Sequence, residues 1–128
     1  MEDRYLYRAK RKNWREFPKE MWWVEGYLYG IWEHRYILWG MTNDVPNMIE
    51  VDPSTICQCT GFKDKNGKLI WENYIVKISG HIYVCYWDEY NFEWGLKSKT
   101  ETVGLGYIDK CIIEVIGNKF DNPELLEV

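Results

Sequence analysis

The clearest indication of the fold is the stretch Thr60-Gly-Phe-Lys-Asp-Lys-Asn-Gly-Lys-Leu-Ile-Trp71. At its centre lies Lys65-Asn66-Gly67-Lys68, and an Asn-Gly pair tolerates the positive φ that both central positions of a tight hairpin turn require. Phe62 before the turn and Leu69-Ile70-Trp71 after it supply apolar strands. We therefore expect a β-hairpin here. The stretch informs about fold rather than chemistry, because it forms no nucleophile, metal cage or phosphate-binding loop.

Composition favours strands over helices along the whole chain. The sequence has 128 residues, 17% of them aromatic, and aromatic side chains fit the pleated, half-buried surface of a sheet. Alanine, the strongest helix former, occurs once, at Ala9. A chain of this length can bury a substantial apolar core. We expect a mainly β protein, β-rich α+β at most, forming one domain over residues 1–128.

Charge, hydropathy and cysteine content set the expected surroundings. The net charge of −4 and the pI near 5.2 argue mildly against a general attraction to nucleic acid. No apolar run approaches the roughly 18 residues that a membrane span needs, and residues 1–4 begin no apolar signal segment. We therefore expect a cytoplasmic protein without a membrane partner. The cysteines are too few for a disulfide scaffold and should be reduced thiols; they are Cys57, Cys59, Cys85 and Cys111.

Turn signals divide the chain into segments. Residues 40–56 have the densest turn composition, so they are the best candidate for a boundary between an N-terminal β-hairpin lobe, 1–50, and a second lobe, 51–128. Asp52-Pro53 and Asn122-Pro123 each predict a short helical turn, with the proline at the first helical position. Apolar alternation predicts strands at 4–9, at 22–39 with a turn near 33–35, and at 74–78, 81–87, 92–96 and 112–118.

A basic cluster interleaved with an indole lies near the N-terminus. This pattern suits phosphate contacts and base stacking on single-stranded nucleic acid, but a solvated turn with Trp14 packed inward explains it more simply, since Glu16 and Glu20 dilute the charge. The candidate nucleic-acid contacts are Arg8, Lys10, Arg11, Lys12, Trp14 and Arg15. Four further indoles would form an apolar partner surface if exposed, although core packing accounts for most of them; they are Trp22, Trp23, Trp32 and Trp39.

The ionisable residues form no recognisable catalytic or metal-binding pattern. The four cysteines with His34 and His81 supply ligand types for zinc, but the paired spacings of structural zinc sites are missing. Cys85 and His81 would lie on one strand face about 13 Å apart, too far for proton transfer. We expect no catalytic residue, metal or cofactor. A glycosidase-like cleft, against which we favour a solvated hairpin turn, would use Asp88, Glu89 and Glu93 beside Trp87 and Trp94.

Two longer stretches carry a family resemblance. They are Cys59-Thr-Gly-Phe-Lys-Asp-Lys-Asn-Gly-Lys-Leu-Ile-Trp-Glu-Asn-Tyr-Ile-Val-Lys77 and Ile113-Glu-Val-Ile-Gly-Asn-Lys-Phe-Asp-Asn-Pro-Glu-Leu-Leu126. Both resemble motifs of the YopX family of temperate phages and prophages of Gram-positive bacteria. Tyr7-Arg8-Ala9 resembles that family's Phe-Arg-Ala-Trp start, and Val51-Asp-Pro-Ser-Thr55 resembles the segment before its central motif. The chain departs at Asn73-Tyr74, where the family usually has Gly-Asp.

The resemblance implies structure more than activity. It implies a β-rich protein of the bacterial host cell whose C-terminal part is an SH3-type small barrel and which assembles into homo-oligomers. We therefore expect a non-enzymatic phage or prophage accessory protein that binds a protein partner or its own copies and has no small-molecule substrate. The alternative is a nucleic-acid-binding module that uses the basic turn. The motif residues are expected to set turn geometry and strand register; they are Thr60, Gly61, Asp64, Asn66, Gly67, Gly117, Asn118 and Pro123.

Overall fold

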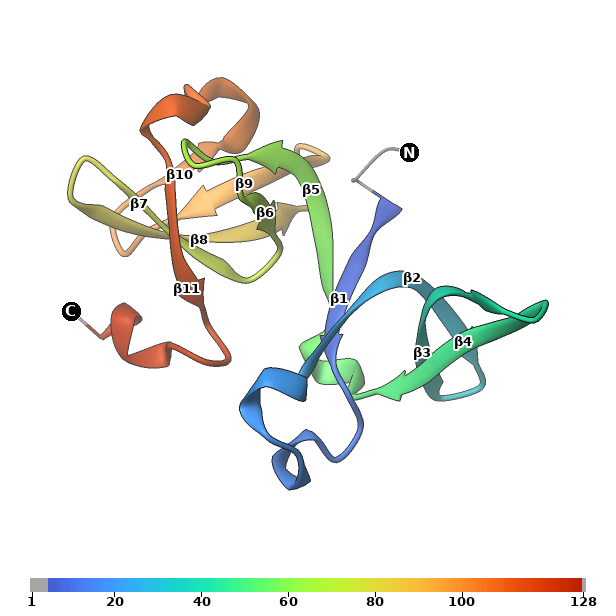
Figure 1. The fold of residues 1–128 in the computed structure, drawn as a ribbon. Coiled ribbons are helices and arrows are strands. Elements are labelled where there is room, and N and C mark those ends of the chain that lie inside the picture. The colour runs from blue at the N-terminus through green and yellow to red at the C-terminus, as the bar shows by residue number, and fades with distance from the viewer. Residues whose placement is uncertain (1–4, 128) are drawn as a thin grey trace. The chain divides into compact units, whose positions relative to one another are not determined.

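The computed structural model describes residues 5–127, which are built mainly from antiparallel strands (Figure 1). The expectation of a mainly β protein is confirmed, and the helical segments are 3-10 turns of three or four residues. The chain divides into two compact units, Met1–Cys59 and Thr60–Val128. The division thus falls after Cys59, whereas turn composition suggested residue 50, because a strand occupies much of the turn-rich region.

Unit 1 is organised around a meander of long strands. Trp23–Ile31 (β2) pairs with His34–Thr42 (β3), which pairs with Val45–Val51 (β4). The other edge of β2 pairs with Tyr7–Lys10 (β1), so the first expected strand is present, although Arg4 lies outside the described residues. The sheet order is β4-β3-β2-β1-β5-β6, with β5 at Cys57–Lys63 and β6 at Leu69–Trp71.

One face of this sheet is buried and the other is partly open. Ile37 pairs with Leu28 on one side and Ile49 on the other, and it is fully buried with Ala9 and Val51 in the core of the unit. Because side chains alternate across a strand, the neighbouring positions point away from that core. They carry large side chains that remain between 39% and 46% exposed, namely Tyr27, Tyr29, Ile31 and Met48.

The turn-rich region forms a hairpin rather than a lobe boundary. Asn43 (φ 51°) and Asp44 (φ 64°) both have left-handed backbones, which is what the two central residues of a type I′ turn require. β4 follows at once and includes Pro46, which is tolerated because β4 is the edge strand of the sheet. Turn composition did not predict this hairpin, because the same residue types mark both linkers and tight hairpins.

Unit 2 contains a second open sheet. Its order is β10-β9-β8-β7-β11, and all the registers determined are antiparallel. Inward residues of β7, β8 and β9 form one apolar cluster with Ile70 and Ile113, while within the described residues no sheet closes into a barrel. The strands are Tyr74–Ile78 (β7), His81–Asp88 (β8), Glu93–Lys97 (β9), Thr102–Gly104 (β10) and Glu114–Asn118 (β11).

The hairpin of the 60–71 stretch is present, but its turn differs from the expected two-residue form. Gly67 is left-handed (φ 80°), whereas Asn66 does not have positive φ. Asp64 organises the loop instead: its Oδ1 accepts the N–H groups of Asn66 (2.9 Å) and Lys68 (2.8 Å). Its Oδ2 accepts the N–H of Val115 at 2.9 Å, 51 residues along the chain. A buried carboxylate thus joins the β5–β6 loop to β11.

The remaining motif residues also shape the backbone. The hydroxyl of Thr60 donates to the Ile70 carbonyl (2.7 Å) and accepts from the N–H of Phe62 (3.1 Å), and Gly61 is left-handed (φ 85°). In β11 a register shift between Val115 and Gly117 forms a bulge. The buried Asn118 accepts the N–H groups of Phe120 and Asp121. Both expected helical turns are confirmed as 3-10 segments, starting at Pro53 and Pro123.

Candidate protein-interaction surface

Lys10 ends β1, and its ammonium group lies among three indoles. The residue is 1% exposed, and its Nζ is 3.7 Å from the ring centroid of Trp14, 4.5 Å from that of Trp22 and 5.5 Å from that of Trp23. Trp14 and Trp22 also meet edge to face at 4.6 Å. Cation–π contacts of this kind contribute about 0.5–2 kcal/mol. Lys10 is therefore enclosed in the unit, and its charge faces indole rather than solvent.

The other basic residues of this region have partners within the same unit. Arg8 lies 4.0 Å from Glu25 and stacks over Trp23 at 5.0 Å. Lys12 Nζ lies 3.6 Å from the carboxylate of Glu50, and Arg15 stacks on Trp14 at 4.1 Å. Arg11 Nε donates to the Met21 carbonyl at 2.6 Å. The structure thus brings the six predicted nucleic-acid contacts into one region. There, carboxylates and aromatic rings of the same unit already contact most of the positively charged groups.

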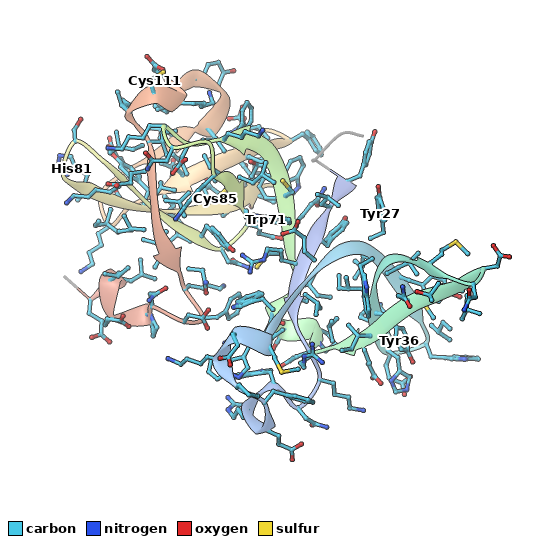
Figure 2. All side chains as sticks on the ribbon, viewed as in Figure 1. Tyr27, Tyr36, Trp71, His81, Cys85 and Cys111 are labelled. Atoms are coloured by element: carbon cyan, nitrogen blue, oxygen red, sulfur yellow. The ribbon has the colours of Figure 1, made fainter. Side chains whose placement is uncertain are left out.

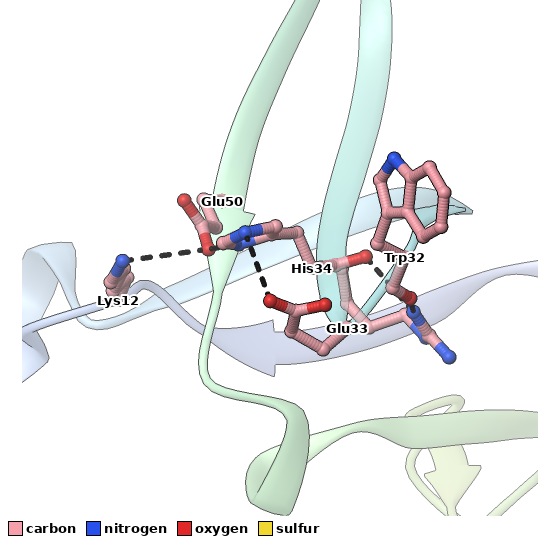
Figure 3. A network of polar contacts seen from close by, with 6 residues as sticks. Lys12, Trp32, Glu33, His34 and Glu50 are labelled. Carbon is pink, nitrogen blue, oxygen red and sulfur yellow. Dashed lines mark hydrogen bonds and ion pairs between the residues drawn. The ribbon is translucent and has the colours of Figure 1, made fainter.

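A polar network lies where β3 begins and β4 ends (Figure 3). His34 Nδ1 lies 2.7 Å from Glu50 Oε2, and His34 Nε2 lies 3.8 Å from Glu33. The hydrogen bond from His34 foremost, and the nearby charge of Lys12, hold the pKa of Glu50 below its usual range. Sequence reasoning missed this network, because His34 and Glu50 are 16 residues apart and β4 was not anticipated.

Next to this network lies an open cavity of about 420 Å³. Trp14 forms part of its wall and its Nε1 donates to Asp52 at 3.3 Å. Burial acts to raise the pKa of Asp52, but hydrogen bonds from Ser54 and from Trp14 outweigh it and lower that pKa. The charged lining consists of two cations and four carboxylates, which disfavours a polyanion. These residues are Lys12, Arg15, Glu16, Glu33, Glu50 and Asp52.

Two hairpin turns display aromatic residues on left-handed backbone. Trp32 (φ 57°) lies between β2 and β3 and is 87% exposed, and Phe92 (φ 53°) lies between β8 and β9 and is 79% exposed. Left-handed backbone disfavours bulky side chains, and glycine, asparagine and aspartate are its usual occupants. Glycine, asparagine or aspartate occupies seven of the other positive-φ positions described, and a small serine occupies the eighth; they are Asn13, Asn43, Asp44, Gly61, Gly67, Asn73, Gly80 and Ser79.

The β8–β9 turn combines exposed rings with carboxylates. Asp88 caps it by accepting the N–H groups of Tyr90 (2.9 Å) and Asn91 (3.2 Å), and its pKa is lowered chiefly by the hydrogen bond from the Asn91 side chain. Tyr90 is 95% exposed beside Phe92. We call this segment, residues 88–93, the β8–β9 tip. The sequence favoured a solvated hairpin turn over a glycosidase-like cleft for these carboxylates, and Asp88 serves as the cap of that turn.

The four indoles that could have formed one surface separate into two groups. Trp22 and Trp23 are half-buried around Lys10, whereas Trp32 is 87% and Trp39 is 53% exposed. Core packing therefore accounts for the first pair only. Trp39 lies where the β3–β4 register shifts between Leu38 and Gly40, so its exposure follows from a bulge.

The cysteines are thiols in different surroundings. Cys57, Cys59 and Cys85 are buried, while Cys111 is exposed in the 3-10 segment Lys110–Ile112 of unit 2 (Figure 2). Among residues 5–127 no group of three or more His, Cys, Asp or Glu side chains has an arrangement that could hold a metal ion. In the same range no helix is long and apolar enough to cross a membrane.

These features define a class: a β-rich protein of two small units that carries exposed aromatic turns. The model of the family described as YopX protein matches residues 7–127 of the chain. The chain therefore belongs to the YopX family, as the resemblance of its motifs predicted. No curated protein matches it significantly.

Proposed function

We propose that the chain is a phage or prophage accessory protein that acts in the bacterial cytoplasm by binding protein, without catalysis, through its aromatic hairpin turns. One observation carries the proposal: Trp32 and Phe92 occupy left-handed turn positions while remaining 87% and 79% exposed. A bulky L residue in left-handed backbone destabilises the fold by roughly 1–2 kcal/mol. Exposed rings bury little apolar area within the chain, so their packing offsets little of that cost. Aromatic side chains are also the commonest anchors of protein interfaces.

A binding comparison between matched variants tests the proposal. Immobilised wild-type chain, Trp32→Asn, Phe92→Asn and Tyr107→Ser would be exposed to extract of phage-infected Gram-positive cells, and retained proteins would be quantified by mass spectrometry. Tyr107 is 84% exposed but does not have positive φ, so it is the control. We expect defined proteins that the wild type and the control retain and at least one turn variant loses. Equal retention by all four chains would remove the proposal.

The nucleic-acid alternative rests on the stacking of Arg8 and Arg15 over indoles, an arrangement that can also receive bases. It remains a prediction, with the carboxylates of the adjacent cavity arguing against it. Electrophoretic mobility shifts with single-stranded DNA and RNA across a salt series test it. Phosphate contacts are strongest at low salt, so no shift at low salt would eliminate this alternative.

The SH3-type barrel is part of the same proposal for unit 2. Support comes from the consecutive pairing of β7, β8, β9 and β10 and from the return of β11 beside β7. Barrel closure would need hydrogen bonds along the outer edges of this sheet. Amide exchange measured by NMR tests it, since unprotected edge amides throughout β10 and β11 would exclude closure.

A further inference from the structure

The β2–β3–β4 meander of unit 1 has an accessible face that points away from the core of the unit. Tyr29 of β2 lies beside Tyr36 of β3, with ring centroids 6.5 Å apart, and Tyr36 pairs with Glu50 of β4. Directly opposite residues of antiparallel strands project from the same face, so these side chains form one row across the sheet. The next row consists of Tyr27, Leu38 and Met48 (Tyr27 and Tyr36 are labelled in Figure 2). We call the residues of the two rows other than Glu50 the tyrosine face.

The tyrosine face is apolar, exposed and small. Its exposed members include Tyr27, Tyr29 and Met48. The two rows are about 7 Å apart along the strands, and each row crosses three strands, about 10 Å. A standard interface buries about 800 Å² on each partner, far more than a face of this size supplies. A partner that matches it therefore presents a short segment rather than a broad surface.

The first row leads into the cavity of about 420 Å³, because Glu50 belongs to the row and also lines the cavity. Among residues 5–127, two cations and four carboxylates line this cavity, which gives the lining a net charge of −2. That balance includes Lys12, the ion-pair partner of Glu50, so it does not depend on any group being unpaired. The hydrogen bond from His34 to Glu50, and those that outweigh burial at Asp52, hold the pKa of each carboxylate below its usual range. Both are therefore charged at neutral pH.

The indole in the cavity wall has no open side for a further cation. The Nζ of Lys10 lies 3.7 Å from the ring centroid of Trp14, and the guanidinium carbon of Arg15 lies 4.1 Å from it. Two like charges this close to one centroid lie on opposite faces of the ring. A cation that enters the cavity from outside therefore pairs with the carboxylates, as ammonium and guanidinium groups do.

We propose that the tyrosine face and the adjoining cavity bind a short basic segment of a protein partner, with apolar side chains on the face and a lysine or arginine in the cavity. Tyrosine suits both parts of such a segment, because its ring packs against apolar groups and attracts cations. The net charge of −4 of the whole chain attracts the same kind of partner. The inference rests on the proposed function and names the chemistry of the partner, since the Trp32 turn joins β2 to β3 and so belongs to the same strand pair as the face.

A selection from random peptides tests the chemistry of the partner. Yeast would display peptides of about 12 residues, long enough to cross the face and reach the cavity, and would be sorted with the biotinylated full chain. Sorting should enrich peptides that have a net positive charge and combine Lys or Arg with aliphatic or aromatic residues. Their binding should weaken as salt is raised, because salt screens exposed charges. A library that yields no binder, or binders without net positive charge, would overturn the inference.

Matched tyrosine variants locate the site on the chain. An enriched peptide, synthesised with a fluorophore, is the probe, and its anisotropy reports binding. Tyr29→Ser should bind this peptide at least tenfold more weakly than the wild type, which is the effect of losing one interface anchor. Tyr107→Ser removes an exposed tyrosine of unit 2 and should bind normally. Circular dichroism checks both folds, and equal binding by the two variants would overturn the inference.

Paired carboxylate variants test the cavity without disturbing its hydrogen-bonded members. Glu16→Gln with Glu33→Gln brings the net charge of the lining to zero, and both residues are exposed. This chain should bind the peptide about fivefold more weakly at low salt, with little difference at high salt. Glu124→Gln with Glu127→Gln changes the charge of the whole chain equally but lies in unit 2, so it should bind normally.

Equal weakening by the two carboxylate pairs would show a general charge effect and overturn the inference. The proposed function would survive that result if Trp32→Asn or Phe92→Asn still lost host proteins in the binding comparison. Failure of the proposed function is seen separately, as equal retention of host proteins by all four chains of that comparison.

Discussion

Asp64→Asn should destabilise unit 2 strongly, because one buried carboxylate joins a loop to a distant strand. Asp64 is 6% exposed and accepts three backbone N–H groups at 2.8–2.9 Å. Hydrogen bonds to a charged acceptor contribute about 1.5–3 kcal/mol each, but they share one group and do not add. The asparagine amide retains one acceptor oxygen and turns a donor toward the remaining N–H groups. We expect a loss of about 3 kcal/mol in the free energy of unfolding.

The loss should depend on pH in a defined direction. Burial acts to raise the pKa of Asp64, but hydrogen bonds from Val115, Lys68 and Asn66 outweigh it and hold that pKa below its usual range. A carboxyl group whose pKa is lower in the folded state stabilises the fold at any pH above its unfolded-state pKa of about 3.9. That stabilisation is lost as the pH falls through the folded-state pKa. The gap between wild type and Asp64→Asn should therefore be full at pH 7 and narrow below about pH 4.

Urea unfolding followed by tryptophan fluorescence at pH 7, 5 and 3 measures this gap. Asp88→Asn is the matched control, since Asp88 also caps a turn through two backbone N–H groups but does so at an exposed site. Its effect should be clearly smaller. An Asp64→Asn chain no less stable than Asp88→Asn at pH 7, or a gap that stays constant on acidification, would refute the reasoning.

Three further substitutions probe the backbone. Trp32→Asn should raise stability by about 1 kcal/mol and the melting temperature by about 2–6 °C, because asparagine tolerates the left-handed turn. Trp39 does not have positive φ, so Trp39→Asn should not raise the melting temperature. Equal effects of the two substitutions would contradict this account. Gly67→Val should cost about 1–2 kcal/mol from strain at φ 80° alone, since no heavy atom lies within 4 Å of an added Cβ, and Gly67→Asn should cost less in the same melt. Gly117→Ala should cost about 1 kcal/mol, because its Cβ would lie 2.5 Å from Asn122 Oδ1, which accepts the Asn118 N–H; an unchanged urea midpoint would count against it.

Local patterns predicted most strands of unit 2. Tyr74–Ile78 was placed correctly, and His81–Asp88 extends one residue beyond the predicted alternation. Both strands combine β-branched or aromatic residues with clear turn signals at their ends, so neighbouring residues suffice to define them.

The sequence-based predictions failed where the same residue types are compatible with two different local structures. β4 was missed because Asn43-Asp44 and Pro46 mark a linker as well as a hairpin with an edge strand. The turn at Asn66-Gly67 was assigned two left-handed residues, but the Asp64 carboxylate holds a longer loop in which Gly67 is left-handed and Asn66 is not. That outcome depends on Val115, which lies 51 residues away and is not visible from the local sequence.

The candidate surfaces were predictable in composition but not in exposure. The basic cluster was evident, whereas its carboxylate partner Glu50 comes from a strand that was not anticipated. Trp32 and Phe92 resemble core residues in sequence, because aromatic residues usually pack inward. Only the backbone angle at each position reveals that these rings occupy turns.

The positions of the native thiols allow local unfolding of each unit to be followed by thiol labelling. Cys111 alone is exposed, whereas Cys57 and Cys59 are buried at the end of unit 1 and Cys85 is buried in unit 2. A thiol reagent should thus modify one site at once and the other three only as fast as the surrounding strands separate. Peptide mapping of the label over time would show which unit opens first, without any introduced probe.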